Sequence, residues 1–343
     1  MKPIVLVHGE IPPDRVASFR ALHEREGLLV ARFRGERLHA TRGVDDPGVP
    51  FVDVSEREVY RVARGARAVI AGTSGRVALP SAYLGARRLG VPFVLWTALW
   101  AHPRTPAHLL SWPLLRHLYT HADAVVTYGE HVSAYVARRG AREVHVAPQA
   151  VDPAFWSAGE RREPERFRAL FVGRPMAPEK GVGVLLDAWR RARVDGDLVI
   201  AGPVARPGEA QGIRFTGEVE REEIRNFLAG ASVLVMPSIA TPSFREPWGL
   251  VANEAMHMNV PVIATDRVGA AAGGLVRHER NGLIVPANDA EALAAALRRA
   301  AGDDTLRRTL GTNAGRDVAA FTPEAWAAGM AGAVQSAELR RNR

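Results

Sequence analysis

Short, almost wholly apolar runs alternate with longer stretches of mixed polarity along the first half of the chain. Such continuous apolar runs are typical of parallel strands that are covered on both faces of a sheet. We predict strands at PIVLVH (3–8), LLVARF (28–33), RAVIAG (67–72), PFVLWT (92–97), DAVVTY (123–128) and EVHVAP (143–148). We predict helices between them at 14–26, 57–64, 80–89 and 130–139.

The same pattern restarts after residues 152–168, a charged stretch with prolines and no clear period, which we interpret as a linker. Further strands are predicted at ALFVG (169–173), DLVIAG (197–202), SVLVMP (232–237), VPVIAT (260–265) and GLIVP (282–286). Further helices are predicted at 182–192, near 250–258, at 290–300 and at 322–341. Alternating strands and helices indicate βαβ units, so the predicted fold class is α/β, with two Rossmann-like doubly wound domains.

The length and composition of the chain agree with two domains. It has 343 residues, of which 47% are hydrophobic, and this is long for a single core. The absence of cysteine excludes disulfides, thiolate metal sites and cysteine nucleophiles. We expect neither a signal peptide nor a membrane-spanning segment, and hence a cytoplasmic protein.

The charge of the chain is uneven. Up to Asp152 the chain has 20 basic residues (lysine and arginine) and 14 acidic ones (aspartate and glutamate). After Asp152 it has 25 basic and 23 acidic residues, and the whole chain has a net charge of +8. This bias favours phosphate-bearing ligands, nucleic acid or anionic lipid, and a solvated basic surface is an equal alternative. A nucleic-acid partner is disfavoured because no aromatic stacking positions interleave with a basic stripe.

Two loops carry the candidate chemistry. In FVGRPMAPEKGVGVLLDAW (171–189), Arg174 and Lys180 flank the start of a helix, whose free amides suit a diphosphate. Apart from Lys2, Lys180 is the sole lysine of the chain, and its compact charge differs from the planar fork of arginine. The alternative is a loop with two surface cations.

The second loop is FREPWGLVANEAM (244–256). Gly249 allows a ligand close to the backbone, and the amides of Gly249, Leu250 and Val251 precede the predicted helix. Glu254 lies one turn inside that helix, where its carboxylate can hold a vicinal diol such as ribose. Glu246 precedes Pro247 and faces another part of the same ligand. The alternative pairs Glu254 with an arginine and leaves Glu246 exposed. Together the two loops describe a nucleoside diphosphate attached to a sugar.

These motifs resemble the GT-B retaining glycosyltransferases of family 4 (group 1). The resemblance rests on GRPMAPEKG (173–181), FTGEVEREEIRNFLAGASVLVMPS (215–238), EPWGLVANEAMHMNVPVIAT (246–265) and VRHERNGLIVPANDAEALAAAL (276–297). It implies an acceptor-side domain at 1–153, a donor-binding domain at 154–320, a cleft between them, and a closing helix at 321–343 that packs back on the first domain.

The resemblance also implies the role of each candidate residue. Arg174 and Lys180 contact the donor pyrophosphate, Glu254 binds the ribose, and Glu246 binds the sugar hydroxyls. Trp248, Gly249, Leu250 and Val251 lie beside the sugar and phosphate, and Val219 borders the base in the FTGEV loop. His102 follows the strand at 92–97 and stands near the reacting sugar. A surface histidine is the alternative for His102.

The sequence also departs from the family pattern. The loop VHGEIPPDR (7–15) has one glycine where the family often has a glycine-rich loop, which bears on acceptor contacts by Gly9, Glu10 and Arg15. VGAAAGG (268–274) replaces the usual glycine pair before an acidic residue, and Gln149 replaces a common asparagine.

The predicted function is a metal-independent transfer of a sugar from a nucleoside-diphosphate sugar, acting as donor substrate and not as a cofactor, to a hydroxyl acceptor. The resemblance implies that the reaction is retaining, so that the anomeric configuration is kept. DDP (45–47) and DDT (303–305) are predicted turns and not metal ligands. The acceptor is a glycan, a lipid-linked molecule or a small molecule. The alternatives are a protein that binds nucleotide sugars without transfer, and an epimerase. For SWPLLRHLYTHA (111–122), contact with the inner membrane surface and packing within the first domain both stay open.

Overall fold

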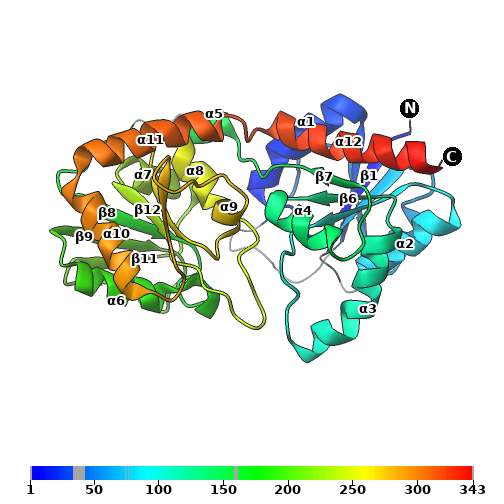
Figure 1. The fold of residues 1–343 in the computed structure, drawn as a ribbon. Helices are drawn as coiled ribbons and strands as arrows, with labels where there is room; N and C mark the ends of the chain where they lie inside the picture. The colour runs from blue at the N-terminus through cyan, green and yellow to red at the C-terminus, as the bar shows by residue number, and fades with distance from the viewer. Residues whose placement is uncertain (1, 34–42, 74, 76, 158–160, 342–343) are drawn as a thin grey trace. The chain divides into compact units, whose positions relative to one another are not determined.

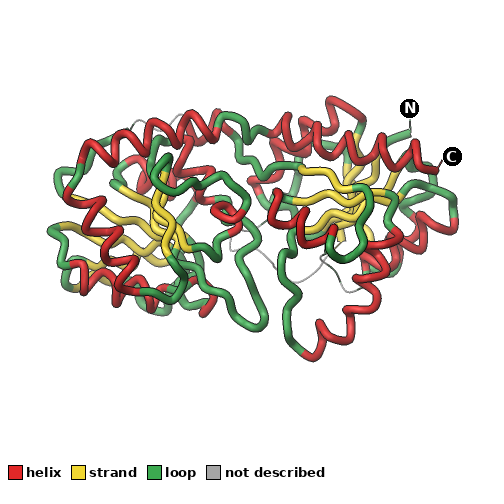
Figure 2. Tube along the Cα trace, in the orientation of Figure 1, coloured by secondary structure: helices red, strands yellow, loops and turns green. Residues whose placement is uncertain are grey.

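The structure of the protein, a computed structural model, describes residues 2–33, 43–73, 75, 77–157 and 161–341. It consists of two compact units. Unit 1 combines Met1–Asp152 with Phe321–Arg343, and unit 2 is Pro153–Ala320. In Figure 1 the red C-terminal helix runs along the blue N-terminal elements of unit 1, and Figure 2 shows a layer of strands between helices in each unit.

Seven parallel strands form the sheet of unit 1, in the order β3-β2-β1-β4-β5-β6-β7. The chain leaves β1 to one side and returns on the other with β4, so the sheet is doubly wound. All five residues of β5 are buried, as expected for a central strand. The strands are β1 Ile4–His8, β2 Leu28–Phe33, β3 Phe51–Val54, β4 Ala68–Gly72, β5 Phe93–Thr97, β6 Ala124–Thr127 and β7 Val144–Val146.

Helices cover both faces of this sheet. Buried side chains of α1 and α12 pack over one face, and those of α2, α3 and α4 pack over the other. The elements are the 3-10 turns η1 Pro13–Arg15 and η2 Glu58–Arg61 and the helices α1 Val16–Glu26, α2 Ala78–Arg88, α3 Pro106–His121, α4 Glu130–Ala137 and α12 Pro323–Arg341.

Helix α12 joins unit 1 although it follows unit 2 in the chain. Its first turn carries Pro323, and the Thr322 hydroxyl accepts a hydrogen bond from the Ala325 amide at 3.1 Å. Trp326 is fully buried with its ring 5.7 Å from that of Trp96. A Cβ at Gly329 would lie 2.2 Å from the Val146 carbonyl oxygen, so this helix lies directly on the sheet.

Unit 2 has a second seven-stranded sheet in the order β10-β11-β9-β8-β12-β13-β14, parallel except for the antiparallel edge pair β10–β11. The predicted fold class, two doubly wound α/β domains, is therefore confirmed. The strands are β8 Phe167–Val172, β9 Gly196–Ala201, β10 Gly208–Ala210, β11 Ile213–Gly217, β12 Val233–Met236, β13 Val262–Thr265 and β14 Gly282–Val285.

The helices of unit 2 also flank their sheet, with α6 and α10 packed over the same face. Helix α8 contacts α11 and β13. The elements are α5 Pro153–Ser157, η3 Pro178–Lys180, α6 Val182–Ala192, α7 Arg221–Ala229, α8 Val251–His257, α9 Gly269–Ala272, α10 Ala290–Gly302 and α11 Asp304–Val318. Within the described residues, no helix has both the length and the apolar character that crossing a bilayer requires.

Several predicted elements were wrong. The helix predicted at 57–64 is only the 3-10 turn η2. The predicted linker at 152–168 contains α5 and the start of β8, and its residues 158–160 lie outside the described part. The predicted turn at 303–305 begins α11, where the Asp303 carboxylate accepts a hydrogen bond from the Leu306 amide at 2.8 Å. The edge strands β3 and β10 and the inner strand β11 were not predicted.

A polar junction ties α11 to the segment before β14. The guanidinium of Arg280 donates two hydrogen bonds to the Asp317 carboxylate, at 2.7 and 2.8 Å. The amide of the fully buried Asn281 donates to the same carboxylate at 2.8 Å. Hydrogen bonding from Arg280 is the main reason why the pKa of Asp317 is lowered from its ordinary value.

Asp317→Asn is expected to reduce the free energy of unfolding at neutral pH by about 1–2 kcal/mol, because charge-assisted hydrogen bonds are lost. A carboxyl with a lowered native pKa stabilises the fold above its unfolded pKa, and this contribution disappears as the pH falls through the native pKa. Urea unfolding at neutral and acidic pH should therefore show a difference from the parent that shrinks in acid. Asp195→Asn is the control, because Asp195 is 89% exposed. A difference independent of pH would contradict this role of the charge.

Candidate functional site

The candidate residues of unit 2 belong to loops at one edge of its sheet. Strands β8 and β12 are parallel neighbours, so the loops that follow them leave the same edge. The chain passes from β8 to β9 on one side and later returns to β12 on the other, which makes the β8–β12 boundary the switch point of this sheet. Ligands of open α/β sheets bind outside the carboxyl ends of the strands at such points.

Lys180 and Glu246 meet at this switch point. Lys180 ends the turn η3 after β8, and Glu246 lies in the loop after β12. The ammonium of Lys180 forms an ion pair with the Glu246 carboxylate, and the Ser238 hydroxyl donates to the same carboxylate at 3.3 Å. The two charged side chains are 18% and 7% exposed. The structure thus joins the two loops that the sequence singles out.

Backbone contacts hold these loops together as well. The amide of Ile239 donates to the Glu179 carbonyl at 2.8 Å. Gly181 has a φ of 65°, and a Cβ there would lie only 2.0 Å from the Pro237 carbonyl oxygen. Glycine is therefore required where the first loop turns into α6, for its left-handed backbone and for the close approach of the second loop.

Arg174 lies at the start of the first loop and is exposed. Its guanidinium pairs with Glu179, five residues further along the same loop, at 3.1 Å. The Glu179 side chain is only 14% exposed, so it is a fixed acceptor that orients the arginine. A role for Arg174 at the pyrophosphate stays a prediction.

The EPWGL turn is shaped by contacts with 268–270. Glu246 pairs with Val268 in a β-bridge, and the Ala270 amide donates to the Trp248 carbonyl at 2.8 Å. The Trp248 indole N–H donates to the Asn253 side chain at 2.8 Å, and Trp248 is buried. Its side chain is thus part of the packing. The small residues of VGAAAGG allow this approach, since a Cβ at Gly269 would lie 1.9 Å from the Pro247 carbonyl oxygen.

Gly249 and Glu254 lie further along this segment. Gly249 has a φ of 88°, and a Cβ there would lie 2.3 Å from the Met236 methyl group. The helical hydrogen bonds begin where the Ala252 amide donates to the Gly249 carbonyl, and the amides of Leu250 and Val251 lie at this first turn. Glu254 is in the first turn of α8 and is 8% exposed.

Two other predicted residues lie elsewhere. Val219 is half-buried between β11 and α7, and the strand order puts β11 two places from β8. His102 belongs to unit 1, where its Nε2 lies 2.9 Å from the His108 carbonyl oxygen and its ring 4.7 Å from Trp112. Their roles at the base and at the reacting sugar, and the cleft between the domains, stay predictions.

Sequence reasoning missed three supporting residues: Glu179, Ser238 and Asn253. Glu179 directly precedes Lys180, so the sequence already showed an acidic residue beside the two cations Arg174 and Lys180. Ser238 ends the run VLVMPS and is 3% exposed, and Asn253 is fully buried in the apolar run after Gly249. Polar residues inside apolar runs were the available signal, because burial requires such groups to have partners.

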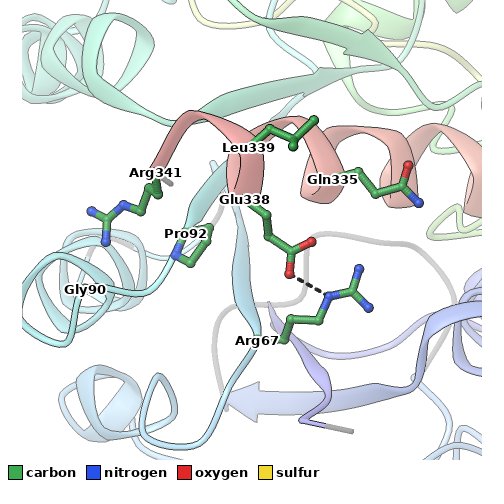
Figure 3. Close-up of a pocket in the computed structure, with 7 residues that line it drawn as sticks. All are labelled: Arg67, Gly90, Pro92, Gln335, Glu338, Leu339 and Arg341. Carbon is green, nitrogen blue, oxygen red and sulfur yellow. Dashed lines mark hydrogen bonds and ion pairs between the residues drawn. The ribbon is translucent and has the colours of Figure 1, made fainter. Parts of the chain in front are cut away.

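A separate cavity of about 1010 Å³ lies at the amino-terminal edge of the sheet in unit 1, between the end of α12 and the starts of β4 and β5 (Figure 3). Of the two arginines that line it, Arg67 pairs with Glu338 at 2.7 Å and with Glu26 at 2.9 Å. None of the candidate residues lines this cavity.

A protein-family model described as "Glycosyl transferases group 1" matches residues 166–303. Alpha-D-kanosaminyltransferase of Streptomyces kanamyceticus is 30% identical over 262 residues, 68% of this chain and 67% of that protein. D-inositol 3-phosphate glycosyltransferase of Jonesia denitrificans is 31% identical over 212 residues, 52% of this chain and 48% of that protein. The chain spans about half or less of the length of several of its curated relatives.

Among solved structures, Anabaena Alr3699/HepE in complex with UDP and glucose has a TM-score of 0.76 with this chain. The match covers 98% of this chain and 100% of that one, at 17% sequence identity. At this identity the likeness shows the fold alone, which is the GT-B arrangement of two Rossmann-like domains.

Gly181→Ala is expected to lower the free energy of unfolding of unit 2 by about 1–3 kcal/mol from backbone strain at one residue, and further through the clash with the Pro237 carbonyl. Gly183→Ala is the matched control two residues on, where a Cβ meets nothing within 4 Å. Because Gly183 is inside α6, alanine there should be neutral or stabilising by up to about 1 kcal/mol. Urea unfolding of the two variants measures the difference, and equal stability would contradict the close approach of the loops.

Proposed function

The chain belongs to the group 1 (family 4) glycosyltransferases, and we propose that it transfers a sugar from a nucleoside-diphosphate sugar to a hydroxyl acceptor. The proposed reaction retains the anomeric configuration and needs no metal ion. The observation that carries this proposal is the Lys180–Glu246 pair at the switch point of unit 2, which places a cation and an anion side by side. A nucleotide sugar suits both charges, because its diphosphate is anionic and its hydroxyls donate hydrogen bonds to a carboxylate.

Lys180 is the proposed electrostatic partner of the leaving group. When the bond between sugar and nucleotide breaks, negative charge concentrates on the β-phosphate, and a fixed cation stabilises that charge as it grows. The lysine ammonium has three donors, so it can contact a phosphate oxygen while it still donates to Glu246. Arg174, on the same loop, supplies a second cation, and Glu179 limits the positions that its guanidinium takes.

Glu246 and Glu254 are the proposed contacts to hydroxyl groups. Glu246 is fixed by Lys180 and Ser238, so its carboxylate is positioned before a sugar binds. We assign it to the transferred sugar and assign Glu254, on the first turn of α8, to the ribose. Trp248–Val251 would lie along the sugar and phosphate, Val219 beside the base and His102 beside the reacting sugar. No enzymatic nucleophile is assigned. In the proposed reaction the β-phosphate takes the acceptor proton on the face from which it leaves.

The relatives support transfer of a sugar, and a solved structure of the same fold supports a nucleotide donor. Two are named as glycosyltransferases of an inositol phosphate and of kanosamine, and a protein with the same fold binds UDP and glucose. UDP and UDP-glucose are therefore the first ligands to test, with GDP as the comparison. The acceptor is proposed only as a hydroxyl-bearing molecule.

Lys180→Gln is expected to lower kcat by about 100- to 1,000-fold, because an electrostatic contact to the developing charge is lost. Binding of UDP and GDP to the parent and the variant is first measured by calorimetry. Donor hydrolysis and sugar transfer are then assayed with and without EDTA, which tests whether the reaction needs a metal ion. Lys2→Gln is the control, since Lys2 is the other lysine and is exposed. Binding of neither nucleotide, or full turnover by Lys180→Gln, would contradict the proposal. Epimerised donor in the absence of acceptor would favour the epimerase.

Glu246→Gln and Glu254→Gln should affect different parts of the donor. We expect Glu246→Gln to weaken binding of the intact nucleotide sugar about tenfold, the loss of one hydrogen bond to a charged group, with free UDP little changed. Glu254→Gln should weaken both ligands to a similar extent, because both contain the ribose. Calorimetry with UDP and UDP-glucose on each variant makes the comparison. If Glu246→Gln instead weakened both ligands and Glu254→Gln weakened only UDP-glucose, the sugar and ribose assignments would be exchanged. If neither variant changed the binding of either ligand, both assignments would be wrong.

A further inference from the structure

The first segment of unit 2, residues 153–162, contacts helix α7 at both of its ends. Its helix α5 lies at the start of α7, and its later residues reach the end of that helix. The guanidinium of Arg161 donates to the Ala231 carbonyl at 2.5 Å, and the Arg162 amide donates to the Ala229 carbonyl at 2.9 Å. Because the last carbonyls of a helix have no partner within it, these contacts fix the end of α7.

The start of α7 contacts the aromatic ring of Phe155 on α5. The guanidinium carbon of Arg221 lies 4.1 Å from the centre of this ring, and that of Arg225 lies 4.5 Å from it. Arg225 also donates to the Phe155 carbonyl at 3.1 Å. The neighbouring Trp156 is fully buried, and its ring lies 5.2 Å from Arg221. A cation within about 6 Å of an aromatic ring is attracted by its face, so Phe155 holds both arginines.

Helix electrostatics alone does not favour these two arginines. Arg221 is the first residue of α7, where the positive end of the helix dipole disfavours a cation. Arg225 is four residues further on, and like charges at this spacing repel one another. The exposed Glu222 and Glu223 in the same turn reduce this cost, but they do not explain why both arginines lie on α5. We interpret the arginine pair as selected for its contact with Phe155.

Helix α5 also contacts α8, so it touches both helices that carry proposed nucleotide contacts. Helix α7 begins two residues after Val219, the proposed neighbour of the base, and Glu254 of α8 is the proposed ribose contact. The strands that precede these helices, β11 and β12, are three places apart in the sheet. The sheet alone therefore does not determine the distance between the two contacts, whereas α5 contacts both helices directly.

We propose that Phe155 is a positioning residue of the nucleotide site. Held by Arg221 and Arg225, it fixes the first turn of α7 relative to α8, and thereby the distance between Val219 and Glu254. A base and its ribose are joined by one bond, so both contacts form together only when this distance is correct. Phe155 acts through the two helices and not by contact with the nucleotide. This inference rests on the proposed function, because it uses the assignments of Val219 and Glu254.

Phe155→Leu tests the inference, because leucine keeps an apolar side chain but has no aromatic face. We expect UDP to bind about fivefold more weakly, the equivalent of one cation–π contact, and the KM for UDP-glucose to rise by the same factor. The kcat should stay unchanged, because the Lys180–Glu246 pair is not moved. Phe155→Tyr keeps the aromatic face and should restore UDP affinity. Arg225→Gln should weaken UDP binding as Phe155→Leu does.

Inorganic pyrophosphate is the comparison ligand, because it carries the diphosphate without the nucleoside. As a competitor of UDP it should inhibit the parent and Phe155→Leu equally. Arg307→Gln is the matched control variant, since the Arg307 guanidinium lies 5.7 Å from the ring of Phe167 at the start of β8, the opposite edge of the sheet. Arg307→Gln should lower stability towards urea but leave UDP binding as in the parent. Calorimetry gives the affinities, and circular dichroism checks that each variant is folded.

The outcomes separate this inference from the proposed function. A parent protein that binds neither UDP nor GDP would overturn the proposed function, and this inference with it. A parent that binds and transfers, with a Phe155→Leu variant that binds the same nucleotide as tightly, would overturn this inference alone. An equal loss of UDP and pyrophosphate affinity in Phe155→Leu would also overturn it, as would a loss of UDP affinity in Arg307→Gln, because both indicate a general loss of structure.

Discussion

The candidate site depends on one ion pair between two loops that are far apart in the sequence. Lys180 and Glu246 are separated by 66 positions, and both side chains are largely withdrawn from water. Removing two charges from water costs about as much as their attraction returns, so such a pair adds little net stability. We interpret its value as positional: it holds a cation and an anion at the place where the topology of the sheet opens a ligand site. The Ser238 hydroxyl and the backbone contact between Ile239 and Glu179 limit how far the pair can move.

Sheet topology explains why these two loops are neighbours. Strands β8 and β12 are adjacent only because the chain winds to one edge through β9 and returns across β8. Glycines then allow the loops to come within contact distance. Gly181 admits the Pro237 carbonyl, and Gly269 admits that of Pro247. A methyl group at either position would separate segments that carry the charged residues. The positions of these charges therefore depend on glycines that have no side chain of their own.

Most strands were predictable from the sequence because they are buried on both faces and so read as apolar runs. There are three exceptions. The edge strand β3 contains Asp53 and is mostly exposed, the edge strand β10 is exposed throughout, and β11 beside it mixes polar residues with half-buried ones. Their polarity hides the strand pattern. The residues of the site were visible as charges near helix starts, but their pairing was not. Arg174 and Lys180 were both assigned to the pyrophosphate from the sequence, yet Lys180 pairs across to the second loop while Arg174 pairs with Glu179 within its own.

The two units differ in their resemblance to known proteins and in the distribution of their charges. The family match at 166–303 lies within unit 2, where the diphosphate and sugar contacts are proposed. Unit 1 instead carries the acid-free stretch 59–122 and exposed leucines on α2 and α3. A chain that keeps its donor chemistry in one unit can vary the other without disturbing the Lys180–Glu246 pair. The exposed leucines of unit 1 favour association of copies, whereas its exposed arginines repel one another, so the two features of this surface act in opposite directions.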